Sequence, residues 1–183
     1  VPGIGLRRPG DDVGRKASEQ TQGVEGDAGI GGDGVFALDL ERLAAELVEA
    51  AFPEFARVGE VNPRGAISGA EAWWFHRHMI AAHADGYDPR VLARIRPGEA
   101  ISAADYIEML QQRKRFIADV EARCAAYDAL LMPTTPDTAP TIAEVLASDE
   151  AYFRWNSRML RNPSLVNLFD GCALSVPCHD PGS

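Results

Sequence analysis

The chain has 183 residues, the size of one domain, and its formal net charge of −9 argues against a nucleic-acid binder or a protein that docks on an anionic membrane. Hydrophobic residues make up 46% and charged residues 25%, which are globular values, and no apolar run approaches the roughly 20 residues that span a bilayer. An odd number of cysteines, three, does not indicate a disulfide-bonded protein, and the first residues lack the pattern of a secretory signal peptide. A cytoplasmic protein is therefore predicted.

Residues 1–36 are predicted to be a disordered, Gly-rich tail. Ten of the first 34 residues are glycine, and the segment offers too little apolar surface to offset the entropy of ordering. Residues 29–34 match the residue pattern of a dinucleotide-binding loop. Such a loop must follow a strand, and no strand is predicted before these residues. A low-complexity linker is the favoured interpretation there.

Helical periodicity begins after this tail. A short helix is predicted over residues 39–52, where four apolar residues recur on one face and Pro53 follows: Leu40, Leu43, Leu47 and Val48. Residues 58–65 are predicted to be a linker. Ser68 and Glu71 then have capping-box spacing, which predicts a helix that runs to about Gly86.

Two more helices follow. Asp88-Pro89 predicts the start of a short helix that Pro97-Gly98 closes. Ser102 predicts the cap of the longest helix, whose opposite, polar face is at residues 111–115. Its predicted apolar stripe consists of Tyr106, Leu110, Ile117, Val120, Cys124 and Tyr127.

The last third alternates strand and helix signals. Short apolar runs at residues 129–132 and 172–176, each stopped by proline, predict two buried strands. A Thr/Pro-rich loop covers 133–141 and a helix spans about 149–160. Helices between short buried strands indicate an α/β protein, but two strands do not make a sheet that stands alone. The chain is therefore predicted to be mostly helical and to form an incomplete part of an α/β fold.

From about residue 62 onward the chain resembles the carboxyl-terminal part of the amidase-signature family. Order and spacing of four segments carry the resemblance: 66–77 (AISGAEAWWFHR), 87–95 (YDPRVLARI), 127–136 (YDALLMPTTP) and 167–178 (NLFDGCALSVPC). The resemblance implies that residues 37–183 are an incomplete portion of a mixed β-sheet flanked by helices.

The resemblance also implies a reaction. In this family a serine attacks an amide carbonyl, a second serine on a cis peptide relays the proton and a lysine is the base. No two serines are adjacent in this sequence, Lys16 lies in the tail and Lys114 lies on a polar helix face. No catalytic residue can be transferred, so the chain alone is predicted to be inactive.

The predicted function is thus that of an amidase without metal or organic cofactor. Its partners would be a small-molecule amide substrate and a missing amino-terminal catalytic part, and a homodimer stays open. Two alternatives also remain. One is a catalytically dead remnant that acts as a binding or interaction module, and the other is the A subunit of a glutamine-dependent tRNA amidotransferase. Residues 155–160 lack the Asp that the glutamine-using branch employs, which disfavours the second alternative.

Three residues are candidates for substrate binding. Arg94 matches an arginine that holds the substrate carboxylate in the glutamine-using branch, a task that suits a bidentate guanidinium. The alternative is a structural role, in which an arginine at a helix end pairs with a nearby carboxylate. Thr134 and Thr135 follow a predicted strand end, where open α/β sheets place ligands, but they fit a rigid turn equally well.

The remaining polar candidates favour structural roles. Asn167 and Asp170 are expected to hold a turn by bonding their own backbone. Cys172 and Cys178 are expected to be packing thiols, although His179 makes a Cys–His dyad conceivable. The spacing of the three helical histidines, His76, His78 and His83, disfavours a metal site. The aromatic group Trp73, Trp74 and Phe75 is expected to be core.

Overall fold

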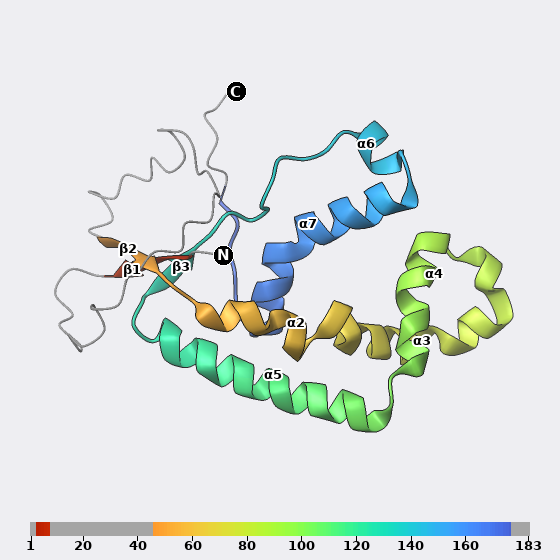
Figure 1. Cartoon of the computed structure of the whole chain (residues 1–183), viewed down its shortest axis with the longest axis horizontal. Helices are drawn as coiled ribbons and strands as arrows, with labels where there is room; N and C mark the ends of the chain where they lie inside the picture. The colour runs from red at the N-terminus through yellow and green to blue at the C-terminus, as the bar shows by residue number, and fades with distance from the viewer. Residues whose placement is uncertain (1–2, 8–45, 177–183) are drawn as a thin grey trace. The chain divides into compact units, whose positions relative to one another are not determined.

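The computed structural model describes residues 3–7 and 46–176 of the chain (Figure 1). It divides into two compact units. The larger, helical unit comprises Phe52–Arg123 and Pro133–Ala173. The described part of the smaller, sheet unit comprises residues 3–7, 46–51, 124–132 and 174–176. None of the described helices has the length and apolar character needed to cross a bilayer.

The sheet unit contains three antiparallel strands in the order β2-β1-β3. They are β1 (Gly3–Arg7), β2 (Glu46–Ala50) and β3 (Ala129–Leu131). Gly5 stands at the centre, opposite Val48 on one side and Leu130 on the other. A Cβ at Gly5 would collide with the ring of Tyr127, so a residue without a side chain is required there.

Two sequence predictions are wrong in this unit. Gly3–Arg7, which was expected to belong to a disordered tail, forms the central strand, whereas residues 8–36 lie outside the described residues. Glu46–Ala50 is a strand and not the end of a helix. The ladder to β1 satisfies the backbone of β2, and such tertiary pairing overrides a short helical pattern.

The two predicted strands have different outcomes. Residues 129–131 do form a strand, but they are not buried: Ala129 is exposed and the two leucines are half-buried. The prediction for residues 172–176 is wrong, since they form no regular element and Leu174 is 87% exposed. A strand needs a neighbour for its backbone hydrogen bonds, and none of the described strands pairs with this segment.

The helical unit starts with short turns that lead into a long helix. These are η1 (Pro53–Arg57), α2 (Val58–Val61), η2 (Pro63–Gly65), α3 (Ala66–His83) and η3 (Ala84–Gly86). The predicted linker at 58–65 is therefore largely helical. Ser68 does not cap α3, because the helix begins two residues earlier and the Ser68 hydroxyl donates to the Gly65 carbonyl. Asn62 Oδ1 instead accepts the Ile67 N–H at 3.0 Å.

The next helices start where the sequence predicts. Asp88 accepts hydrogen bonds from the N–H groups of Arg90 and Val91 and so caps α4 (Pro89–Ile95). A 3-10 segment, η4 (Arg96–Ala100), closes it. Ser102 Oγ accepts the Asp105 N–H at 3.1 Å at the start of α5 (Ala103–Cys124).

The core of the helical unit forms on α5, but on a different face from the predicted one. Met109, Phe116 and Val120 are buried, whereas Leu110 lies at the surface. Only Val120 of the predicted stripe is fully buried. The stripe is rotated because α5 carries apolar residues on adjacent positions, and packing partners decide which row faces inward.

Two further helices complete this unit. They are α6 (Ile142–Leu146), which the sequence analysis missed, and α7 (Asp149–Leu168), which extends the predicted helix. Asn162 on α7 is buried, and its Nδ2 donates to the Pro133 carbonyl at 2.8 Å. A buried amide must find such a partner, so this bond fixes the start of the 133–141 loop on α7.

Charged side chains tie these helices together. Arg123 donates from Nε and Nη2 to the Glu54 carboxylate at 2.7–2.9 Å, and this pairing lowers the pKa of Glu54. Arg113 donates to the Leu168 and Asn167 carbonyls and to Asp170 Oδ1. The predicted turn at 167–170 is present, with the Asp170 N–H bonded to Asn167 O, but the Asp170 side chain binds Arg113.

Candidate functional site

Two glycines define the centre of the candidate site. Gly98 in η4 is buried, and a Cβ there would collide with the carbonyl of Gly69 in α3. The two backbones can approach this closely only because Gly98 has no side chain. Gly98 lines two cavities in the helical unit, one of which Gly69 also lines.

The first of these, here called the arginine-lined cavity, has a volume of about 540 Å³. Residues of η2, the start of α3, α4 and η4 line it, among them Arg64 and Arg94. The remaining lining is small and mainly apolar, including Gly69, Val91 and Ile101. No aspartate or glutamate lines it. The cavity therefore presents positive charge without a built-in counter-ion.

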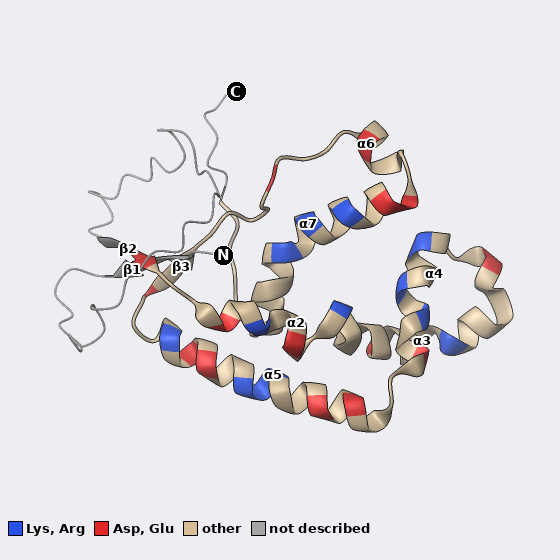
Figure 2. Ribbon diagram, in the orientation of Figure 1, with Lys and Arg blue, Asp and Glu red and all other residues tan. Residues whose placement is uncertain are grey.

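Arg94 lies at the carboxyl end of α4 and is exposed. Among the described residues, no ion pair or hydrogen bond involves its side chain. Elsewhere in the described chain six arginines form ion pairs: Arg57, Arg90, Arg113, Arg115, Arg123 and Arg158. Figure 2 shows the contrast between α4, which has basic segments only, and α5, which carries both signs.

Arg64 is a lining residue that the sequence analysis missed. It has a φ of 53°, in the left-handed region, and Gly65 follows with a φ of 74°. A left-handed conformation is costly for a residue with a Cβ, and such residues are often found at functional sites. The run Asn-Pro-Arg-Gly at 62–65 is a turn signal that could have indicated this geometry.

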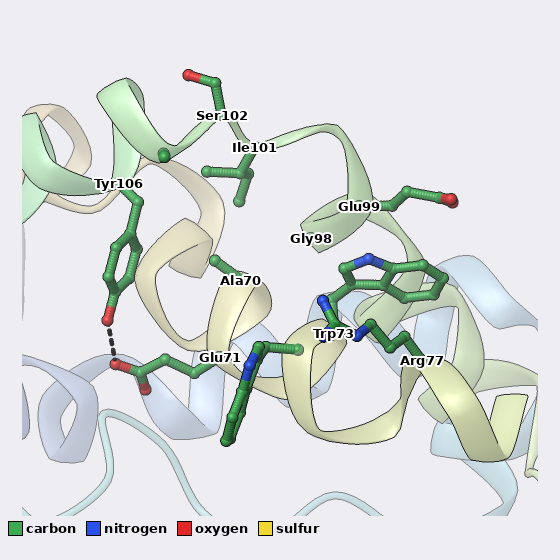
Figure 3. Close-up of a pocket in the computed structure, with 11 residues that line it drawn as sticks. Ala70, Glu71, Trp73, Arg77, Gly98, Glu99, Ile101, Ser102 and Tyr106 are labelled. Carbon is green, nitrogen blue, oxygen red and sulfur yellow. Dashed lines mark hydrogen bonds between the residues drawn. The ribbon is translucent and has the colours of Figure 1, made fainter.

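The second cavity, here called the aromatic cavity, has a volume of about 560 Å³ (Figure 3). Aromatic side chains and both signs of charge line it: Trp73, Trp74, Tyr106, Glu71, Glu99 and Arg77. The Tyr106 hydroxyl donates to Glu71 Oε1 at 2.8 Å, the dashed line in Figure 3. This hydrogen bond raises the pKa of Tyr106, because ionisation would replace a donor with a second negative charge.

Thr134 and Thr135 lie in the exposed loop after β3. Neither lines the arginine-lined cavity or the aromatic cavity. The Thr135 hydroxyl donates to the Asp137 carbonyl at 3.0 Å, as in a side-chain-stabilised turn. The structure thus does not bring them together with Arg94, and substrate binding by the two threonines stays a prediction.

The other sequence candidates have local roles. His76 Nδ1 lies 2.9 Å from the Tyr87 hydroxyl, and the described residues contain no group of three or more side chains placed to hold a metal ion. Cys172 is a free, exposed thiol, whereas Cys178 and His179 lie outside the described residues. Trp74 and Phe75 are about two-thirds exposed, so the expectation of an aromatic core is wrong for both.

Comparison with known proteins gives a consistent family match. A family model described as Amidase matches residues 36–182. The chain is 27% identical over 138 residues to a protein named 2-amino-5-chloromuconic acid deaminase from Comamonas testosteroni. The match covers 75% of this chain and only 30% of that relative. No solved structure matches the chain.

Proposed function

Because the chain belongs to the amidase-signature family, we propose that it is part of an amide hydrolase and supplies a wall of its substrate pocket. The chain spans 30% of the length of the curated relative it matches. In the proposed enzyme, the serine nucleophile, the cis-peptide serine and the lysine base come from family segments outside this sequence. The amide C–N bond breaks, the amine leaves and water then releases the acid from the acyl-serine.

One observation indicates what this chain would contribute to the proposed substrate pocket. Arg94 lines a cavity that has no carboxylate, and its side chain has no ion-pair partner among the described residues. A guanidinium in this state is free to make two parallel hydrogen bonds to a substrate carboxylate. The name of the matched relative specifies an acid, 2-amino-5-chloromuconic acid, as what it acts on. We therefore propose a carboxylate-bearing carboxamide as the substrate class.

The first test compares amides with and without a carboxylate group. The whole gene product should release ammonia from a carboxylate-bearing amide faster than from its neutral methyl ester analogue. With hydroxylamine present, a hydroxamate should form, because the acyl-serine would transfer its acyl group to the better nucleophile. The 183-residue chain alone should do neither. If the whole gene product releases no ammonia from any carboxamide tested, the amidase proposal is wrong.

The second test concerns Arg94. Arg94→Ala should raise KM for the carboxylate-bearing amide by about 10- to 100-fold, the cost of losing a charged hydrogen bond, with a smaller change in kcat. Arg94→Lys should recover part of the loss, because it restores the charge but not the bidentate geometry. Arg96→Ala is the matched control, since Arg96 lies two residues away, is exposed and does not line the cavity. Equal effects of Arg94→Ala and Arg96→Ala would contradict the role of Arg94.

A second candidate function is a remnant that binds without catalysis. Such a remnant would need only the binding residues of the cavity and none of the family's catalytic residues. The two proposals differ in one measurement, the sequence and intact mass of the natural gene product. A longer polypeptide with a Gly/Ser-rich segment supports the amidase, and a product of this length supports the remnant.

A further inference from the structure

We propose that the arginine-lined cavity binds a dicarboxylate, with one carboxylate on Arg94 and the second on Arg64. This inference rests on the proposed function only in taking this cavity as the substrate site. It adds a second charged group to the ligand and assigns a role to Arg64.

The two arginines enter the cavity from different elements. Arg64 belongs to η2, at the entrance to α3, and Arg94 belongs to the last turn of α4. Each is exposed, and among the described residues neither side chain has an ion-pair or hydrogen-bond partner. The rest of the lining is small and mostly apolar, including Gly69, Ala72 and Ile101. Two cations on one mainly apolar wall suit a ligand with two anionic groups and a hydrocarbon body.

The charge balance favours a dianion over a monoanion. The chain as a whole is acidic, with 27 Asp and Glu against 18 Lys and Arg, yet no carboxylate among the described residues lines this cavity. Two unpaired arginines on one cavity free of carboxylates leave a double positive charge uncompensated. A ligand with one carboxylate would neutralise half of this charge, whereas a dicarboxylate would neutralise all of it. The cavity volume of about 540 Å³ lies in the usual range for small-molecule sites.

Binding can be measured without any turnover. Isothermal titration calorimetry of the whole gene product at low ionic strength would compare succinate, glutarate and adipate with butyrate, valerate and hexanoate, because each pair has the same chain length. We expect the best dicarboxylate to bind at least about tenfold more tightly than its monocarboxylate, the effect of one further charged contact. Equal affinities for all three pairs would overturn the proposal.

The variant that tests Arg64 must tolerate a left-handed backbone. Arg64→Asn removes the charge and retains a residue that readily adopts this conformation. It should abolish the preference for the dicarboxylate and leave binding of the monocarboxylate within about twofold, since one charged contact accounts for the preference. Arg96→Asn, the same change at an exposed position outside the cavity, should leave the preference intact. An unchanged preference in Arg64→Asn would refute the role of Arg64.

This binding assay separates the two proposals. If dicarboxylates bind in an Arg64-dependent way but no carboxamide is hydrolysed, the amidase proposal fails and the dicarboxylate site stands. If carboxamides are hydrolysed but dicarboxylates gain nothing over monocarboxylates, the amidase stands and the dicarboxylate site fails.

Discussion

The two cavities of the helical unit share part of a wall and differ in charge. Gly98 and Ile101 line both of them. On one side the charged lining is Arg64 and Arg94 alone, whereas on the other side Glu71 and Glu99 accompany Arg77. Backbone packing at the glycines therefore creates two hollows of similar size, and the side chains decide which ligand charge each one favours.

The two cavities also differ in whether their polar side chains already have hydrogen-bond partners. In the aromatic cavity, Tyr106 and Glu71 are already bonded to each other, and the other charged lining residues, Glu99 and Arg77, have opposite signs. In the arginine-lined cavity, neither guanidinium has a partner among the described residues. A polar group that is already paired gains little from a ligand, whereas an unpaired charge can gain a full charged hydrogen bond. This difference is why we propose ligand binding in the arginine-lined cavity.

The largest expected effect comes from the shared wall. Gly98→Ala should lower the free energy of unfolding by about 3 kcal/mol, since the new methyl group meets the rigid Gly69 backbone and not a movable side chain. It should also weaken ligand binding, because the wall of the cavity must move. Thermal or urea unfolding followed by circular dichroism would measure the loss.

Gly69→Ala is the matched control for this change. A Cβ at Gly69 meets nothing within 4 Å, and alanine favours a helix interior over glycine by up to about 1 kcal/mol. We expect unchanged or slightly increased stability. If the two variants have the same stability, the close contact does not determine the packing of η4 on α3.

A smaller effect is expected from placing a carboxylate in each cavity in turn. Ser68→Asp adds an anion to the arginine-lined cavity, and Ala103→Asp adds one to the aromatic cavity. Both positions lie in the first turn of a helix, where a negative charge is tolerated. Ser68→Asp should weaken dicarboxylate binding by about tenfold through competition for the arginines, and Ala103→Asp should leave it nearly unchanged. Similar losses in both variants would indicate that net charge, and not the site, controls binding.

The smallest effect concerns the bonded pair in the aromatic cavity. Tyr106→Phe should cost less than about 1 kcal/mol between pH 6 and 9, because solvent screens this exposed hydrogen bond. The folded state raises the pKa of Tyr106 above its usual value of about 10, so the stabilisation is present below pH 10 and is lost as the pH rises through the folded-state pKa. Phenylalanine should remove this alkaline loss. Unfolding curves at pH 8 and pH 11 would show it, and identical alkaline losses in both proteins would contradict the assignment.

The sequence predicted the features that depend on neighbouring residues. Asp88 caps α4 and Ser102 caps α5 as expected, since a cap needs only the N–H groups two or three residues ahead. Arg94 was also selected from the sequence, through a family resemblance that the Amidase match to residues 36–182 confirms. The resemblance held because it rested on the order of four segments and not on one motif.

Features that depend on distant residues were decided by the tertiary structure. Gly3–Arg7 becomes a strand because residues 46–50 and 129–131 pair with it, and residues 172–176 form no strand because none of the described strands pairs with them. Arg64 of η2 and Arg94 of α4 line one cavity, which no sequence spacing encodes. The sequence by itself thus determined the helix caps and the family of this protein. The tertiary structure decided which strands form and which charges meet, because hydrogen-bond ladders and cavities require partners far apart in the chain.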